Sequence, residues 1–108
     1  MQLISQMDQI FTASGCNLWL CPYEILATGP NCGLIEAVSD SLSIHALKEK
    51  MGQNSTLLDY FNRQFGPKNG ARAKKAKDNF CSSLAAYSLV CYILQIKDRH
   101  NGNILVDI

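Results

Sequence analysis

The order of apolar and polar positions predicts one helix and three short strands in the first third of the chain. Apolar side chains recur at helical spacing along residues 1–11, and Ser14 with Gly15 marks the end of this helix. Three short apolar runs then predict strands, at residues 17–21, 23–28 and 34–38. Pro22 separates the first two, and the turn-forming residues 29–33 predict that the second and third form a hairpin.

The rest of the chain is predicted to be helical until its last residues. Ser43 and Ser55 each precede a short helix with apolar residues at helical spacing. A long helix is predicted for residues 71–96, and past Ser82 it is apolar on nearly every side, which is typical of a helix buried between neighbours. A strand follows at residues 104–106. Strands followed by helices predict the α+β class.

Length, composition and net charge set limits on the core, the exposed surface and the partners of this chain. Its 108 residues, 47% of them hydrophobic, are enough for one core, to which we assign Trp19 and Phe80. Only 18% of the residues are charged, below the usual quarter, so more of the surface than normal is expected to be covered by something else. The net charge of +1 gives no reason to expect nucleic acid as a partner. The oligomeric state stays open.

The five cysteines are an odd number, and none form a Cys-x-x-Cys pair. We expect reduced thiols, most of them buried, in preference to a disulfide framework. No His is placed to complete a zinc site. No apolar run reaches the ~18 residues of a membrane span, so the protein is expected to be soluble or to touch a membrane only at its surface.

A group of cations lies around the start of the long helix: Lys68, Arg72, Lys74, Lys75 and Lys77. Each would gain ~1 kcal/mol near an anionic lipid surface, yet a solvated helix start is the simpler interpretation. The position is unfavourable in itself, because the N-terminus of a helix carries a partial positive charge.

Residues 97–103 read Lys-Asp-Arg-His-Asn-Gly-Asn and contain a candidate acid–base pair and a candidate metal ligand. His100 is a suitable proton acceptor, because an imidazole titrates near neutral pH. Asp98 would orient the loop or stabilise the imidazolium that forms. Asn103 offers a neutral oxygen to Mg²⁺. Taken alone, the same residues also fit a polar turn between a helix and a strand, and that is the alternative.

Two residues of this segment and one far from it in the sequence are given structural roles. Arg99 is expected to hold the loop to neighbouring backbone in preference to touching a substrate. Gly102 is expected to permit a turn that a Cβ would hinder. His45, on the short helix after Ser43, is expected to be an ordinary, partly exposed histidine.

A wider signature surrounds the loop: Ser83-x-Ala85, Leu89, Tyr92-Ile93-Leu94, Ile96 and Asp98-Arg99-His100-x-x-Asn103. In this signature the chain resembles the phosphoinositide 3- and 4-kinase family. Its Asp-Arg-His order is the reverse of the His-Arg-Asp found in protein kinases. Three further segments are more similar to the type III phosphatidylinositol 4-kinases, and within these to the β-type: Ser43-Ile44-His45, residues 57–61 and Gln95-Ile96-Lys97.

The resemblance implies part of a two-lobed, protein-kinase-like fold. Residues 1–38 would form the lower N-lobe with the hinge, and residues 39–108 the start of the C-lobe with the catalytic loop 97–103. The nucleotide-binding residues implied in this way are Tyr23, Ile35, Glu36, Ala37 and Val38. Tyr23 would lie at the back of the nucleotide pocket, while Glu36 and Val38 would bind adenine through backbone groups.

The resemblance also implies an activity: transfer of the ATP γ-phosphate to the 4-hydroxyl of phosphatidylinositol. His100, Asp98 and Arg99 would be the catalytic residues and Asn103 the Mg²⁺ ligand. The protein would be cytoplasmic and peripheral, on the cytosolic face of Golgi or related membranes.

Other motifs of the family are expected outside this chain. The phosphate-binding loop and its Lys are expected before Met1, and the Asp-Phe-Gly motif after Ile108, so we expect the isolated chain to be inactive. Two alternatives remain at this point. One is a truncated kinase remnant that acts as a binding module, and the other is an unrelated α+β interaction domain.

Overall fold

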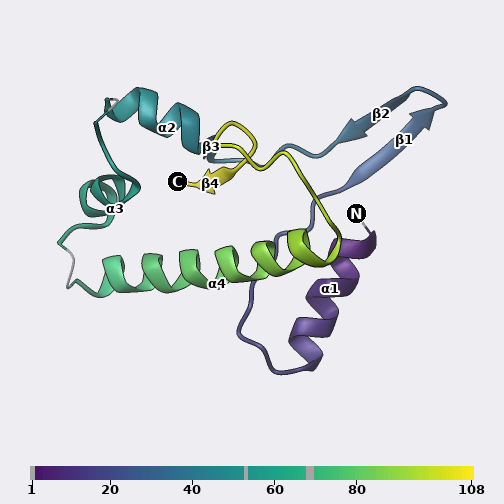
Figure 1. Cartoon of the computed structure of the whole chain (residues 1–108), viewed down its shortest axis with the longest axis horizontal. Helices are drawn as coiled ribbons and strands as arrows, with labels where there is room; N and C mark the ends of the chain where they lie inside the picture. Colours follow the sequence, from purple (N-terminus) through teal and green to yellow (C-terminus); the bar gives the residue numbers. More distant parts are fainter. Residues whose placement is uncertain (1, 53, 68–69) are drawn as a thin grey trace.

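The computed structural model describes residues 2–52, 54–67 and 70–108. In these residues the elements are α1 (Gln2–Ala13), β1 (Ile25–Gly29), β2 (Cys32–Ile35), β3 (Ser41–Ser43), α2 (Ile44–Met51), α3 (Leu57–Phe65), α4 (Ala71–Ile93) and β4 (Leu105–Asp107). Helices and small antiparallel sheets share the chain (Figure 1), which agrees with the predicted α+β class. Met1 and Lys68, predicted in the first helix and in the cation group, lie outside the described residues.

The end of α1 is the one predicted. Gly15 has a φ of +68°, and the N–H of Cys16 donates to the C=O of Phe11 over 3.0 Å. The N–H of Gly15 also donates to the C=O of Thr12 over 3.1 Å. These bonds satisfy carbonyls that the helix end leaves free, and glycine adopts the left-handed backbone without steric cost.

The strand predicted at residues 17–21 is wrong, because this segment is irregular. Its backbone groups bind side chains of α4. The Ser82 hydroxyl donates to the C=O of Asn17 over 2.8 Å. The Tyr87 hydroxyl accepts from the N–H of Cys21 over 3.1 Å and donates to its C=O over 3.3 Å. A polar backbone group needs a partner, and here α4 provides it in place of a neighbouring strand.

The predicted hairpin is confirmed as the antiparallel pair β1–β2, in which Leu26 lies opposite Leu34. Its turn is shorter than the predicted 29–33, so β2 starts before the predicted residue 34. β2 also ends at Ile35, before the predicted residue 38. The hairpin projects from the rest of the chain (Figure 1), and both of these leucines are exposed.

The last strand pairs with one that the pattern did not predict. β3 and β4 are antiparallel, with Ser41 opposite Asp107 and Ser43 opposite Leu105. Three residues of mixed polarity carry no strand signal, so the long-range pairing decides their conformation. Ser43 then caps α2 as predicted, since its side chain accepts from the N–H of Ala46 over 3.1 Å.

The two later helices differ from prediction at one end each. α3 is capped by Thr56 and not by Ser55, and the Asp59 side chain accepts from the Thr56 N–H in return. α4 ends at Ile93, three residues before the predicted end, because Gln95 adopts a φ of +54°. The N–H of Ile96 there donates to the C=O of Cys91 over 3.0 Å. This is the same ending as in α1, with Gln in the place where Gly is preferred.

The main core cluster joins α1, the irregular segment and α4. Its buried members are Phe11, Leu20, Ala86 and Val90, each 5% exposed or less. A second contact lies between α3 and α4, where the rings of Phe61 and Phe80 meet edge to face at 5.4 Å. Phe80 is therefore half-buried, but the prediction for Trp19 is wrong, because 53% of it is exposed.

The described chain is open. Its radius of gyration is 15.8 Å, whereas a compact domain of this length has one of about 13 Å. The prediction that α4 is buried on nearly every side is wrong in these residues, because α1, the irregular segment and α3 leave part of its surface uncovered. Several of its apolar side chains are exposed: Leu84, Leu89, Tyr92 and Ile93.

The exposure of the cysteines differs from the prediction. All five cysteines are unpaired, but Cys16, Cys32 and Cys81 are exposed, so the prediction of mostly buried thiols is wrong.

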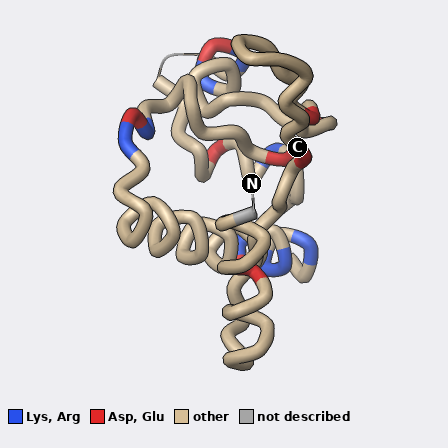
Figure 2. Tube along the Cα trace, turned by 90° about the vertical axis from the view of Figure 1, so that its right-hand side faces the viewer, with Lys and Arg blue, Asp and Glu red and all other residues tan. Residues whose placement is uncertain are grey.

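Charged residues occur in short runs separated by long uncharged stretches (Figure 2). Of the described helices, none combines the length and the apolar character that crossing a membrane requires.

Candidate active site

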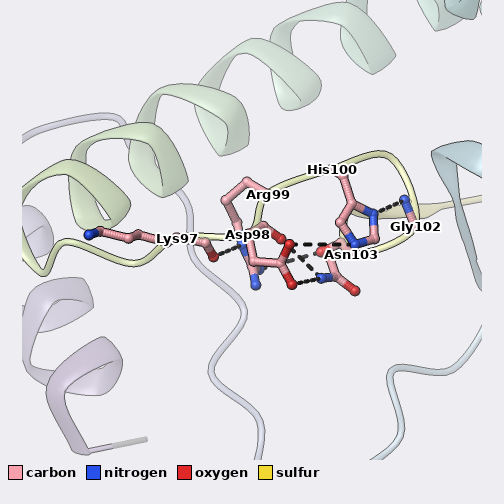
Figure 3. A network of polar contacts seen from close by, with 6 residues as sticks. All are labelled: Lys97, Asp98, Arg99, His100, Gly102 and Asn103. Carbon is pink, nitrogen blue, oxygen red and sulfur yellow. Dashed lines mark hydrogen bonds and ion pairs between the residues drawn. The ribbon is translucent and has the colours of Figure 1, made fainter.

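The 97–103 loop leaves α4 and enters β4, and all of its residues are exposed (Figure 3). Asp98 has a φ of +62°, a left-handed conformation that Asp tolerates better than most residues. The loop closes on itself, since the N–H of Asn103 donates to the C=O of His100 over 2.8 Å. It is therefore a folded turn with its polar side chains open to solvent.

The Asp98 carboxylate contacts both of the other candidate residues (Figure 3). Asn103 Nδ2 donates to Asp98 Oδ2 over 3.1 Å and to the Asp98 C=O over 2.9 Å. His100 Nε2 lies 3.7 Å from the other carboxylate oxygen, Asp98 Oδ1. The structure thus brings the predicted acid–base pair and the predicted metal ligand together.

One hydrogen bond indicates the tautomer of the neutral imidazole. The Gly102 N–H donates to His100 Nδ1 over 3.1 Å, so the neutral ring carries its proton on Nε2, toward Asp98. A Cβ on Gly102 would lie 3.0 Å from the ring Cε1 and 3.1 Å from Nδ1. The glycine therefore permits the close approach of the ring, and no left-handed backbone is involved.

Arg99 binds the backbone of the loop itself. Its Nε donates to the C=O of Lys97 over 3.1 Å, and its Nη1 to the C=O of Asn103 over 3.4 Å. These contacts tie the start of the loop to its end, in line with the structural role expected for this side chain.

Asn103 and Asp98 offer the oxygens that Mg²⁺ prefers. Asn103 Oδ1 accepts no hydrogen bond from any described residue, since only its Nδ2 is engaged. Residues 2–52, 54–67 and 70–108 contain no group of three or more His, Cys, Asp or Glu side chains placed to hold a metal ion. Because Mg²⁺ usually takes one or two protein ligands and completes its shell with phosphates and water, these residues fit part of such a site.

The predicted hinge, Gly33-Leu34-Ile35-Glu36 followed by Val38, covers the end of β2 and the residues just after it. The N–H of Glu36 donates to the C=O of Glu24 over 2.9 Å, and its carboxylate accepts from the Glu24 N–H over 2.8 Å. Within the described residues, no hydrogen bond uses the C=O of Glu36 or the N–H of Val38. One free acceptor and one free donor are what the amino group and ring nitrogen of adenine require.

The other predicted nucleotide-binding residues are less constrained. Ile35 and Ala37 are exposed, and Tyr23 is half-buried in the irregular segment before β1. No hydrogen bond links the Tyr23 side chain to the hinge among the residues that the structure describes.

The hinge and the loop each lead into a strand of the β3–β4 sheet. β3 begins three residues after Val38, and β4 begins two residues after Asn103. The N–H of His45, in the first turn of α2, donates to the C=O of Asn101 over 3.0 Å. No such role was predicted for His45, because a backbone donor leaves no signal in the residue type. The His45 side chain is exposed, as expected, and Nε2 lies 3.4 Å from Glu49 Oε1.

Two hollows lie against α2 and α3, and one of them is also lined by Leu42 of β3 and by Ile108. Leu47, Met51 and Tyr60 are among the residues that line them. The Tyr60 hydroxyl is buried and has no hydrogen-bond partner among the residues that the structure describes. Burial raises the pKa of Tyr60, and the negative charge of Asp107 adds to the effect.

Comparison with known proteins identifies the class. The family model described as phosphatidylinositol 3- and 4-kinase matches residues 1–108. The chain belongs to this family, which excludes the unrelated interaction domain considered from the sequence.

Individual relatives are similar along nearly the whole chain. A phosphatidylinositol 4-kinase of Dictyostelium discoideum is 50% identical over 98% of the chain, and phosphatidylinositol 4-kinase beta 2 of Arabidopsis thaliana is 49% identical over 98%. Phosphatidylinositol 4-kinase PIK1alpha of Candida albicans is 46% identical over 98%. The chain spans only 9%, 9% and 12% of the lengths of these relatives.

Proposed function

We propose that the chain forms the hinge and catalytic loop of a phosphatidylinositol 4-kinase, which transfers the γ-phosphate of ATP to the inositol 4-hydroxyl. The observation that carries this proposal is the cluster of His100, Asp98 and Asn103 within one loop. Relatives that are 46–50% identical over 98% of the chain bear the name of this activity.

The proposal includes a two-lobed kinase architecture. Residues 1–38 would contribute the lower N-lobe and hinge, and residues 39–108 the start of the C-lobe. ATP would bind along the hinge through the C=O of Glu36 and the N–H of Val38, which are free in the described residues. The β3–β4 sheet would then hold adenine and the catalytic loop in a fixed relation.

The loop geometry suggests how each side chain acts. His100 Nδ1 is the proton acceptor, and it becomes available when the contact with the Gly102 N–H opens. The imidazolium then holds its Nε2 proton toward Asp98 Oδ1, 3.7 Å away, and the carboxylate stabilises its charge. Mg²⁺, held in part by Asn103 Oδ1, would neutralise charge on the transferred phosphoryl group. Arg99 keeps the loop closed.

The test uses the full-length protein that contains this chain, with ATP, Mg²⁺ and vesicles containing phosphatidylinositol. We expect phosphatidylinositol 4-phosphate as the product, identified by chromatography against the 3-phosphate. Asn103→Ala should raise the Mg²⁺ concentration needed for half-maximal rate, with little change in stability because the side chain is exposed. Residues 1–108 alone should be inactive.

A full-length protein that phosphorylates no lipid would contradict the proposal. It would favour the alternative, a kinase remnant that acts as a binding module. We also propose attachment to the cytosolic face of Golgi or related membranes, which rests on the family resemblance. Imaging of the tagged full-length protein against Golgi markers tests that location.

A further inference from the structure

A single hydrogen bond connects the 97–103 loop to another element among the described residues. It is the bond from the His45 N–H to the Asn101 C=O, 3.0 Å long. The other bonds of the loop are internal and involve Lys97, Asp98, Arg99, His100, Gly102 and Asn103. The loop therefore keeps its own shape, while its position depends on the first turn of α2.

The backbone N–H groups of that first turn have hydrogen-bond partners outside the helix. The N–H of Ile44 donates to the C=O of Ile104 over 3.0 Å, just after the loop. The N–H of Ala46 donates to the Ser43 side chain over 3.1 Å. Ser43 also pairs with Leu105 across the β3–β4 sheet. The N–H groups of Ile44, His45 and Ala46 are among those that a helix start leaves open, and each has a partner here. Two of the acceptors flank or belong to the loop.

We infer that His45 is a positioning residue for phosphoryl transfer, and that it acts through its backbone N–H. The first turn of α2, capped by Ser43, fixes Asn101 and so places His100 and Asn103 relative to the nucleotide held at the hinge. The His45 imidazole takes no part, because it is exposed and turned to Glu49. This inference rests on the proposed function, since the reaction is the one that the loop would catalyse.

The chain contains a matched control for removing this N–H. Proline lacks the donor and is tolerated in the first turn of a helix. His45 is the second residue of α2, and Leu58 is the second residue of α3, whose N–H binds no other segment of the described chain. His45→Pro and Leu58→Pro therefore impose the same helical constraint, but only His45→Pro releases the loop. His45→Ala keeps the N–H and removes the imidazole.

The experiment measures kcat and the KM for ATP in the full-length protein. We expect kcat of His45→Pro to fall between about tenfold and a hundredfold below that of His45→Ala, since small misplacements of reacting groups cost this much. The KM for ATP should stay within about twofold of the wild-type value, because the hinge is untouched, and Leu58→Pro should match wild type within about twofold. Equal losses in His45→Pro and Leu58→Pro, or in His45→Pro and His45→Ala, would overturn the inference.

A second readout does not depend on activity. Hydrogen exchange of a peptide that covers residues 97–103 should be faster in His45→Pro than in Leu58→Pro, and equal rates would contradict the anchoring. A wild-type protein that makes no lipid product would defeat the proposed function, while this readout would still decide the anchoring. If proline at residue 45 prevents folding, Ser43→Ala weakens the same turn more gently, and Ser43→Asp should restore both exchange protection and kcat.

Discussion

The contact of α1 with α4 and the 97–103 loop are held in different ways. Phe11, Leu20 and Val90 are buried at the contact and are 5% exposed or less. In the loop, by contrast, the side chains of Asp98 and His100 are 77% and 62% exposed and are connected by polar contacts. One region depends on the removal of apolar surface from water, and the other on directional bonds.

The difference shows where stability and chemistry are separated. The loop buries too little to hold its own position, so it takes that position from α2 and the β3–β4 sheet. The α1–α4 contact contributes stability and, in the described residues, carries none of the catalytic candidates. Substitutions in the two regions should therefore affect different measurements.

The largest effect is expected for His100→Ala. Loss of a general base typically lowers kcat by about 10²–10⁴-fold. Because the side chain is 62% exposed, the urea midpoint of the full-length protein should stay at the wild-type value. Steady-state assays with phosphatidylinositol vesicles check the first part and urea unfolding the second. A loss of less than about tenfold would mean that another group accepts the proton.

The next largest effect is expected at the other region, from Phe11→Ala. Truncation of a buried phenylalanine costs about 3–5 kcal/mol of the free energy of unfolding, and Phe11 is 5% exposed. Urea unfolding of the purified protein measures it. Leu26→Ala on the hairpin is the control, since that leucine is 61% exposed and its loss should cost within about 0.5 kcal/mol. Similar costs for both would show that the hairpin is covered in the whole protein.

Tyr87→Phe tests the hydrogen bonds between α4 and the irregular segment that follows α1. It removes the two bonds to the Cys21 backbone and should cost about 1–2 kcal/mol at neutral pH. Burial raises the pKa of Tyr87, although the bond to the Cys21 backbone opposes the rise.

This pKa shift also predicts a dependence on pH. The neutral phenol contributes stability that is fully present below the unfolded pKa of about 10 and is lost as pH rises through the folded value. Urea unfolding at pH 8 and above pH 10 should therefore show a smaller difference between Tyr87→Phe and wild type at the higher pH. A constant difference would contradict the assigned cause.

The two helix ends provide a smaller and opposite pair of effects. Gln95→Gly should stabilise by about 0.5–1 kcal/mol, because Gln95 holds a left-handed backbone that glycine adopts without strain. The gain is reduced by loss of the bond from Gln95 Nε2 to the Tyr92 C=O. Gly15→Ala should destabilise by about 1–2 kcal/mol for the same reason. Thermal unfolding of both variants, measured side by side, separates backbone strain from packing.

The smallest effect is expected at the start of α3. The Thr56 backbone N–H, and then its hydroxyl, lower the pKa of the Asp59 carboxyl. A lowered pKa contributes stability above the unfolded pKa of about 3.9, and this is lost as pH falls through the folded value. Asp59→Asn should therefore be slightly less stable than wild type at pH 7 and equal to it near pH 2. A difference that persists in acid would exclude the carboxylate as its source.

Local signals explain which elements were predictable. Gly15 stops α1 where predicted, whereas Gln95 ends α4 in the same way without any signal in the residue type. Ser43 indicated a helix cap, but nothing in it indicated a strand before that cap. The strand predicted at residues 17–21 was wrong, because Leu20 packs against α4 and the backbone of the segment binds α4 side chains.

The sequence by itself determined the helices, the hairpin and the candidates His100, Asp98 and Asn103. Each of these depends on residues that are close together in the chain, where side-chain spacing and residue type act directly. The tertiary structure alone decided the partner of β4, the anchoring of Asn101 by the N–H of His45 and the exposure of Trp19. The strand pairing and the anchoring join residues far apart in the chain through backbone groups, which are the same in every amino acid but proline. The exposure of Trp19 depends on packing that no local pattern specifies.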